Sequence, residues 1–377
     1  MKKKIQFNVP HLTKNSKKFI KKVLENKNFT DGYFQKKCEQ FIKYNTKTKF
    51  VSLTHSGTSA LEIAINLLNI GKGDEVLIPS YTFTSTANSV IMSGAKPVFV
   101  DVDENLNIDA EKLEKKITKK TKAIIIVHYG GFSCEMNKIL KLKKKYKLFL
   151  IEDAAHVFLA KYNKKYIGTL GEIGMFSFHE TKNFISGQGG ALLINDNKYI
   201  NKAKIILDKG TDRSLYLNLN KKKFYSWKGF GSEYRAPELS AALLFSQFKD
   251  YKNIQKKREK IWKFYYNKLS KFSPKKFKIL NYKNKLKVCS YHSFVIIFKS
   301  IKKRDYFIKF MKMKGIFCYF HYFPLHMSDF GKKFAKDKLL NTEKVWNGLV
   351  RLPIYPGLKI FDLKHITKSV EIFSRLL

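Results

Sequence analysis

The chain has 377 residues, of which 44% are hydrophobic and 28% charged. This length allows two packed domains with large cores, and this hydrophobic content excludes a disordered chain. No run reaches the ~18 consecutive apolar residues that a membrane span needs, and no apolar stretch of a secretory signal follows the basic N-terminus. We therefore expect a cytoplasmic protein without a membrane span.

The net charge is +44, from 74 Lys and Arg against 30 Asp and Glu. Such a charge can indicate a surface for nucleic acid or an anionic membrane, but a binding footprint should be clustered. The basic residues are spread along the whole chain, and no helix-turn-helix, zinc-finger or RNA-binding motif accompanies them. We interpret them as solvated surface charge and predict no nucleic-acid partner.

The four cysteines are scattered, without CxxC or metal-ligand spacing. They predict free thiols in a reducing compartment and no metal site. These residues are Cys38, Cys134, Cys289 and Cys318.

The first 160 residues alternate between helix and strand patterns. Helical spacing appears over residues 16–25 and again at Phe34, Cys38 and Phe41, which we assign to the core. Between residues 50 and 160, short apolar runs alternate with helical segments, which predicts a mostly parallel sheet covered by helices. The strands expected there are 75–78, 96–100, 123–127 and 148–151. The expected helices are 61–68, one that residues 79–86 open and that runs through residue 91, 109–117 and 135–146.

A turn of small residues, Ser56-Gly57-Thr58-Ser59-Ala60, joins the first apolar run to helix 61–68. The first N–H groups of a helix have no partner within it and carry partial positive charge. The backbone of Gly57, Thr58 and Ser59 could therefore bind an anion such as a phosphate. The alternative is an ordinary helix N-cap.

Two further features upstream suit a planar cofactor. Tyr81 or Phe83 could lie flat on such a ring, or pack in the core instead. Strand 148–151 leads into Glu152-Asp153-Ala154-Ala155-His156, and an acid at the carboxyl end of a parallel strand lies at the ligand crevice. Asp153 is either a helix cap or a carboxylate that keeps a pyridinium nitrogen protonated.

Lys182 lies on a turn among aromatic and small residues, between the expected strands 174–178 and 191–194. A lysine that loses water there has a lowered pKa, and its neutral amine is a nucleophile towards carbonyls, including the aldehyde of pyridoxal phosphate. One lysine in a lysine-rich chain is a weak signal by itself. The prediction depends on the upstream features.

The rest of the chain predicts a smaller α+β unit. An irregular segment, 210–231, could be a substrate or interface loop, and a long helix follows from 238 to about 269. We place a large cofactor-binding α/β domain at residues 1–245 and a small C-terminal α+β domain at 246–377. Its expected strands are 293–298 and 316–319, and its expected helices are 304–314 and 363–375. His321 and His326 flank a Pro-Leu turn and are either structural or part of a site.

Together these pieces resemble the type I pyridoxal-phosphate aminotransferases that act on sugar nucleotides. The motifs that carry the resemblance, in order, are Ser-Gly-Thr-Ser-Ala at 56–60, Pro-Ser-Tyr-Thr-Phe at 79–83, Glu-Asp-Ala-Ala-His at 152–156, Ser-Phe-His-Glu-Thr-Lys-Asn at 177–183 and Gly-Gly-Ala at 189–191. The segments 322–326 and 351–353 also match the family's small domain. The resemblance thus covers almost the whole chain and implies the type I fold, with a mostly parallel central sheet sandwiched by helices.

The resemblance implies a role for each motif. Lys182 is the residue that binds pyridoxal 5'-phosphate covalently and is catalytic together with Asp153, the partner of the pyridine nitrogen. The other implied ligands are Gly57, Thr58, Ser59 and Ser177 for the phosphate, Phe83 stacked on the ring, His156 beside the ring hydroxyl, and His326 near the sugar-nucleotide entrance. At the position of Glu233 the family commonly has an Asn, which contacts the phosphate from the neighbouring subunit. We do not assign that contact to Glu233.

Within the family, the motifs at 128–136, 177–183, 209–214 and 320–326 are most similar to the subgroup that makes TDP-4-amino-4,6-dideoxygalactose for surface polysaccharides such as enterobacterial common antigen. That similarity implies TDP-4-keto-6-deoxyglucose as substrate, glutamate as donor and a homodimer with shared active sites. One rival is an enzyme of the same fold with a different keto-sugar. Another is a dehydratase, which has a histidine at the lysine's position. A third is a basic nucleic-acid-binding protein.

Overall fold

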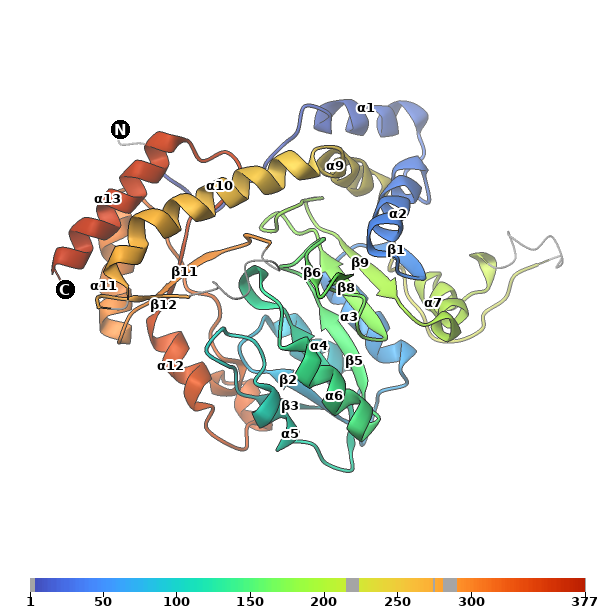
Figure 1. The fold of residues 1–377 in the computed structure, drawn as a ribbon. Coiled ribbons are helices and arrows are strands. Elements are labelled where there is room, and N and C mark those ends of the chain that lie inside the picture. The colour runs from blue at the N-terminus through green and yellow to red at the C-terminus, as the bar shows by residue number, and fades with distance from the viewer. Residues whose placement is uncertain (1–3, 215–223, 274, 281–289, 377) are drawn as a thin grey trace.

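The computed structural model describes residues 4–214, 224–273, 275–280 and 290–376. A seven-stranded sheet with the order β1-β9-β8-β5-β4-β2-β3 forms its centre (Figure 1). The strands are β1 (Phe50–Thr54), β2 (Glu75–Pro79), β3 (Lys96–Val100), β4 (Thr121–Val127), β5 (Phe149–Asp153), β8 (Ile173–Ser177) and β9 (Gly190–Ile194). All run in one direction except β9, which is antiparallel to both β8 and β1. The predicted mostly parallel sheet is confirmed.

Helices cover both faces of this sheet, and the strand sequences explain why. Side chains alternate between faces along a strand, so Ile125 packs in one core cluster while Ile124 and Ile126 pack in another. Both faces are apolar, as expected for buried parallel strands. One face carries α3 (Gly57–Leu67), α4 (Thr84–Met92) and α7 (Ile200–Leu207), and the other carries α1 (Ser16–Asn26), α2 (Tyr33–Thr46), α5 (Ala110–Glu114), α6 (Met136–Tyr146) and α9 (Glu238–Lys249).

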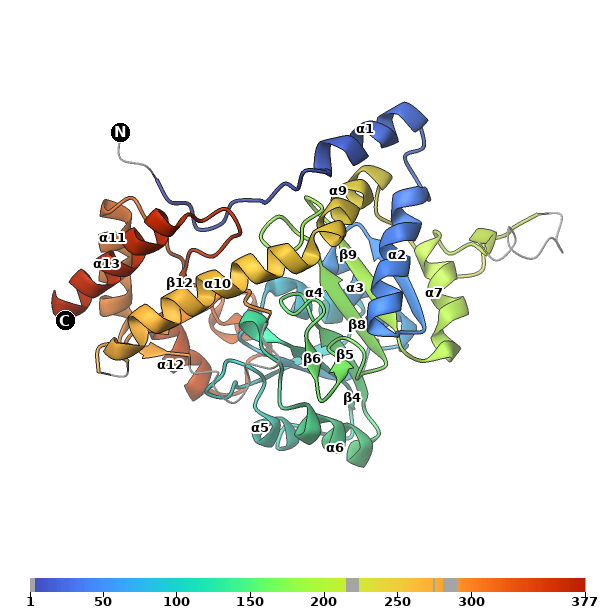
Figure 2. The same ribbon diagram turned by 45° about the horizontal axis from the view of Figure 1, so that its top comes forward.

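A second, antiparallel sheet lies in the last third of the chain, with the order β10-β11-β12. Its strands are β10 (Lys278–Ile279), β11 (Phe294–Ile297) and β12 (Leu349–Leu352), and its helices are α10 (Tyr251–Leu269), α11 (Ile301–Met313), α12 (Leu340–Gly348) and α13 (Ile360–Leu376). Figure 2 shows α10 running from α9 towards β12 and α13. The domain boundary at residues 245 and 246 stays a prediction.

The N-terminal segment joins this second unit. The Ile5 N–H donates to the Gly315 carbonyl at 2.8 Å, and the Phe317 N–H donates to the Ile5 carbonyl at 3.0 Å. Ile5 is buried in a core cluster that also contains Tyr81 and Tyr129 of the large sheet's loops. One apolar core therefore connects the beginning, the middle and the end of the chain.

Several predicted elements differ from the structure. The single helix expected from 238 to about 269 is two helices, because the backbone leaves the helical conformation at Asp250. Segment 316–319 forms only isolated bridges, Ile5 with Ile316 and Tyr319 with Arg351, and α5 ends at Glu114 rather than at residue 117. The irregular segment 210–231 lies partly outside the described residues, as does Cys289, whereas the other three cysteines are buried free thiols. None of the helices in the described part of the chain has the length and apolar character that a bilayer crossing requires.

Candidate active site

The carboxyl ends of β1, β5 and β8 meet at one edge of the large sheet. Asp153 and Ser177 are the last residues of β5 and β8, and Gly190, where the reversed strand β9 begins, pairs with both Thr54 and Ser177. A Cβ atom on Gly190 would lie 2.6 Å from the Gly57 nitrogen, so only glycine lets this strand approach the start of α3. This edge is where a parallel α/β sheet binds its ligand.

The start of α3 forms a cradle against β8. Ser56 caps the helix by accepting a hydrogen bond from the Ser59 N–H at 3.0 Å. A Cβ atom on Gly57 would lie 2.6 Å from the Met175 methyl group and 3.4 Å from the Ser177 hydroxyl, so the bare backbone faces the end of β8. The Gly57 and Thr58 N–H groups and the Ser177 hydroxyl fit a phosphate there, whereas the Ser59 N–H already serves the cap.

Lys182 lies on the loop between β8 and β9, where its N–H donates to the His179 carbonyl at 2.9 Å. Its side chain is half-buried, and desolvation lowers the pKa of its amine to about 8. The carboxylate of Asp153 opposes that shift, and the positive charge of Arg351 adds to it. About a quarter of such an amine is neutral at pH 7.5, compared with about one part in a thousand for an ordinary lysine.

Asp153 is a buried carboxylate with 6% exposure. It accepts hydrogen bonds from the Ala155 N–H at 3.1 Å and the Thr86 hydroxyl at 3.3 Å. Burial raises the pKa of Asp153, while the Ala155 N–H and the charge of Lys182 oppose the rise. No cation lies within ion-pair distance of Asp153 among the described residues. A protonated pyridine nitrogen would supply the missing positive charge, so Asp153 fits this role of the cofactor partner.

His156 is buried and neutral. Burial, followed by the charges of Lys182 and Arg351, lowers its pKa well below the usual value. The Gly130 N–H donates to its Nδ1 at 3.2 Å, so the proton of the neutral ring lies on Nε2. His156 therefore presents an N–H donor, which fits the phenolic oxygen of pyridoxal phosphate.

The structure separates the two aromatic candidates of the sequence. Tyr81 is fully buried, and its hydroxyl donates to the His321 carbonyl at 2.6 Å. Phe83 is 57% exposed, and its ring centroid lies 5.9 Å from that of Tyr322. Tyr81 is thus a core residue, and Phe83 has the exposed ring face that stacking on a planar cofactor requires.

His326 has two protein partners. Its Nδ1 lies 2.7 Å from the Ser80 hydroxyl, and its Nε2 lies 3.2 Å from a Glu343 carboxylate oxygen. These contacts connect the end of β2 with α12 and favour a structural role. Its substrate-binding role stays a prediction. Glu233 is exposed and pairs with Lys209, which balances the charge that departs from the family pattern.

Sequence reasoning left His321 open as structural or part of a site, and it missed three further residues of the second unit that face these groups: His292, Tyr322 and Arg351. His292 stacks on His156, and the Arg351 guanidinium contacts both His292 and His321. Tyr322 and Arg351 were noted only as members of the family patterns at 322–326 and 351–353. Without the fold, nothing in the sequence places them next to Lys182.

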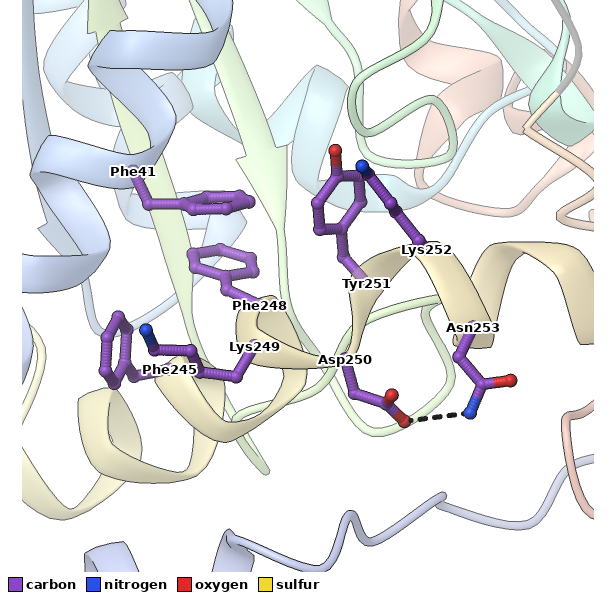
Figure 3. A pocket seen from close by; sticks show the side chains of 8 residues that line it. All are labelled: Phe41, Phe245, Phe248, Lys249, Asp250, Tyr251, Lys252 and Asn253. Atoms are coloured by element: carbon purple, nitrogen blue, oxygen red, sulfur yellow. Dashed lines mark hydrogen bonds between the residues drawn. The ribbon is translucent and has the colours of Figure 1, made fainter.

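Two hollows on the surface lie away from this edge. Figure 3 shows one of about 380 Å³, where Phe41 stacks on Phe248 with ring centroids 4.6 Å apart and Asp250 accepts a hydrogen bond from Asn253. The other, of about 640 Å³, is lined by lysines such as Lys47 and Lys161. Neither hollow is lined by any residue that the sequence assigns to the site.

Comparisons with known proteins agree with this geometry. The sequence model of the DegT/DnrJ/EryC1/StrS aminotransferase family matches residues 10–371. The spore coat polysaccharide biosynthesis protein SpsC of Bacillus subtilis is 30% identical over 377 residues, covering 97% of this chain and 96% of that protein. GDP-perosamine synthase of Escherichia coli O157:H7 is 29% identical over 371 residues, covering 97% of both.

Among solved structures, Helicobacter pylori PseC, an aminotransferase involved in the biosynthesis of pseudoaminic acid, is similar with a TM-score of 0.91. It is 27% identical, and the match covers 100% of both chains. The expected type I fold is confirmed. The chain belongs to the DegT/DnrJ/EryC1/StrS aminotransferase family and is a pyridoxal-phosphate-dependent aminotransferase.

Proposed function

We propose that this enzyme transfers the amino group of glutamate to C4 of a nucleotide-linked 4-keto-6-deoxy sugar. The observation that carries the proposal is the convergence of Lys182, Asp153 and His156 at one sheet edge, with the pKa of Lys182 lowered to about 8. The family match and the full-length similarity to GDP-perosamine synthase support a sugar nucleotide as the acceptor.

The residues of the site have different tasks. When bound, pyridoxal phosphate supplies an electron-withdrawing ring that stabilises negative charge on the adjacent carbon. Asp153 would keep the ring nitrogen protonated, and the His156 Nε2–H would donate to the ring oxygen. Phe83 would cover a ring face. Lys182 Nζ removes the proton from the donor's α-carbon, and in the second half-reaction it delivers a proton to C4 of the sugar.

The phosphate end is held by the start of α3 and the end of β8. Gly57 and Thr58 offer backbone N–H groups, and Ser177 offers its hydroxyl. Ser59 contributes through its helix cap, because its N–H donates to Ser56. These contacts fix the cofactor without using the amine of Lys182.

For the substrate we propose TDP-4-keto-6-deoxy-D-glucose, giving TDP-4-amino-4,6-dideoxy-D-galactose for surface polysaccharide synthesis in the cytoplasm. The motifs at 128–136 and 320–326 support this choice. The similarity to GDP-perosamine synthase favours a GDP-linked keto-sugar as the second candidate.

Incubation of the purified enzyme with glutamate and each keto-sugar tests the proposal. The TDP-sugar should be consumed at least ~10-fold faster than the GDP-sugar, a difference of about 1.4 kcal/mol in transition-state binding. NMR of the product should show the amino group at C4 in the galacto configuration. Faster turnover of the GDP-sugar would select the second candidate, and no amination of either would reject both.

We further propose a homodimer. Exposed aromatic rings support it, since Phe224, Trp227 and Phe230 are 74%, 81% and 67% exposed within one short segment. Sedimentation velocity should give twice the mass of one chain, and Trp227→Ser should weaken the association. A wild-type monomer at micromolar concentration would contradict the proposal.

A further inference from the structure

The larger of the two surface hollows, of about 640 Å³, lies at the edge of the large sheet opposite the active site. Thr48 and Asn195 line it, and they stand just before β1 and just after the reversed strand β9, at the amino ends of the parallel strands. A hairpin of β6 (Lys161–Tyr162) and β7 (Lys165–Tyr166) forms another wall. A hollow of this volume is within the range of small-ligand sites.

Hydrogen bonds hold the inner wall of this hollow in place. The buried Thr48 hydroxyl donates to Asn195 Oδ1 at 2.7 Å. Asn195 Nδ2 in turn donates to the Gly168 carbonyl at 3.1 Å and to the Gly171 carbonyl at 2.8 Å. These bonds tie the start of β1, the end of β9 and the segment before β8 together. The hollow therefore has a fixed shape before any ligand binds.

The hollow is strongly basic. Among the described residues that line it there is no Asp or Glu, but there are five exposed lysines: Lys47, Lys49, Lys161, Lys164 and Lys165. Within the described part of the chain, no carboxylate forms an ion pair with any of the five. Glu172, whose carbonyl accepts from the Asn195 N–H, pairs with Lys143 at 2.5 Å. The next residue after Asn195, Asp196, pairs with Lys198 at 3.0 Å.

One feature of the hollow works against an anion. Lys47 follows the last residue of α2 (Tyr33–Thr46), and a helix carries roughly half a negative elementary charge at its carboxyl end. Five ammonium groups outweigh this partial charge. A single carboxylate would balance one of them, whereas a diphosphate carries several negative charges, and lysine is a common partner of phosphate. The charge of the hollow therefore favours a diphosphate.

Two tyrosine rings add an aromatic surface to the same hollow. Lys47 Nζ lies 4.4 Å from the ring centroid of Tyr44, and Lys161 Nζ lies 4.4 Å from that of Tyr166. Each pair keeps an ammonium group beside a flat ring. Tyr44 is 75% exposed, so much of its ring is accessible to a nucleobase, and stacking on an aromatic ring suits any base.

We propose that this hollow is a second ligand site, which binds a nucleoside diphosphate with its phosphates among the five lysines and its base on Tyr44. The same chemical group occurs in a free nucleotide and in a nucleotide sugar. The inference does not depend on which keto-sugar the enzyme aminates. A nucleic acid would need a groove that follows its backbone, and a closed hollow suits a single nucleotide better.

Calorimetric titration of the holoenzyme with ADP and with inorganic pyrophosphate, in buffer without divalent metal, tests the proposal. Lys161→Glu combined with Lys165→Glu reverses two charges of the exposed hairpin and should weaken binding of both probes by about 100-fold. Lys302→Glu combined with Lys309→Glu, on exposed positions of α11, changes the net charge equally and should leave both affinities unchanged. Binding of a probe at the active site would persist in both variants, because none of the four lysines belongs to it.

Two results would overturn the site itself. If the hairpin variant binds both probes within ~3-fold of wild type, the hollow does not bind them. If the α11 variant loses as much affinity as the hairpin variant, the attraction belongs to the whole basic surface rather than to the hollow.

Tyr44 tests the nucleoside part. Wild type should bind ADP at least ~10-fold more tightly than pyrophosphate, because the base adds stacking. Tyr44→Ala should remove this difference, and Tyr44→Phe, which keeps the ring, should preserve it. Equal affinities of wild type for the two probes would contradict nucleoside binding.

Two further probes identify the source of the ligand. ADP-glucose that binds as tightly as ADP supports a nucleotide sugar, and ADP-glucose that binds at least ~10-fold more weakly supports a free nucleotide. A single-stranded oligonucleotide that binds the hollow more tightly than ADP would assign it to nucleic acid and overturn the proposal.

Discussion

The ring of His156 stacks on the ring of His292, with centroids 4.1 Å apart and planes inclined by 13°. His156 follows β5 of the large sheet, whereas His292 precedes β11 of the small one. Burial lowers the pKa of both rings, and each positive charge nearby lowers it further. The stack therefore joins the two sheets through two neutral imidazoles at the centre of the site.

Replacing His292 should weaken cofactor binding. His292→Ala removes the ring behind His156 and the partner of Asn183, so His156 loses its fixed orientation. We expect about fivefold weaker binding of pyridoxal phosphate, in line with the ~1 kcal/mol of an aromatic pair. Fluorescence titration of the apoprotein with pyridoxal phosphate measures this affinity. His292→Phe keeps the stack and should lose less affinity. His365→Ala, on the partly exposed side of α13 and bonded to the Lys314 carbonyl, is the control. Wild-type affinity in His292→Ala would contradict the role.

Lys182→Ala should abolish covalent attachment of the cofactor. The purified variant should lack the absorbance of lysine-bound pyridoxal phosphate, and turnover should fall by ~1,000-fold or more, because the variant loses both the attachment point and the proton carrier. Lys198→Ala, which removes a surface lysine paired with Asp196, is the matched control. Retained turnover in Lys182→Ala would exclude the assignment.

The lowered pKa of Lys182 predicts when the apoprotein captures its cofactor. Only the neutral amine attacks the aldehyde, so the capture rate should rise about tenfold per pH unit below pH 8 and level off above it. Stopped-flow absorbance measures the profile. Since the carboxylate of Asp153 raises this pKa, Asp153→Asn should move the midpoint below 8. A midpoint near that of an exposed lysine would show that the amine is solvated.

Asp153→Asn should keep the cofactor but lose most activity. The amide is nearly isosteric: its oxygen can still accept from the Ala155 N–H, and its NH2 group can donate to the Thr86 hydroxyl oxygen, so folding and attachment should survive. It cannot hold a proton on the ring nitrogen, and we expect activity to fall by ~100-fold or more. Steady-state kinetics with cofactor content measured in parallel gives the answer. Unchanged activity would remove the pyridinium argument.

Much of the large sheet could be predicted because its signals are local. The β-branched run at 123–127 and the acid after 148–151 identify β4, β5 and Asp153 from neighbouring residues alone. The expected strands also place the turn at Gly57 and the loop of Lys182, because each lies directly after the end of a strand. Once the strands are parallel, their carboxyl ends must meet at one edge.

The remaining parts depend on contacts between distant segments. Asp250 breaks a continuous helical pattern, because α9 packs against α1 and α2 while α10 packs in the C-terminal core. Nothing in the sequence distinguishes Arg351 from a surface cation, because its contacts with His292 and His321 depend on the position of β12 in the fold. The hydrogen-bond partners of His326, which are Ser80 and Glu343, lie 246 and 17 residues away in sequence, so the pattern around His326 could not show them.

The bonds of Ile5 with residues 315 and 317 have a consequence for biosynthesis. The ribosome releases Ile5 long before residues 315 and 317, because about 310 residues separate them in the sequence. During that interval this apolar side chain is uncovered, and its closing contact spans a very large loop, which slows folding. A chaperone that shields the nascent amino-terminal segment should therefore raise the yield of native enzyme.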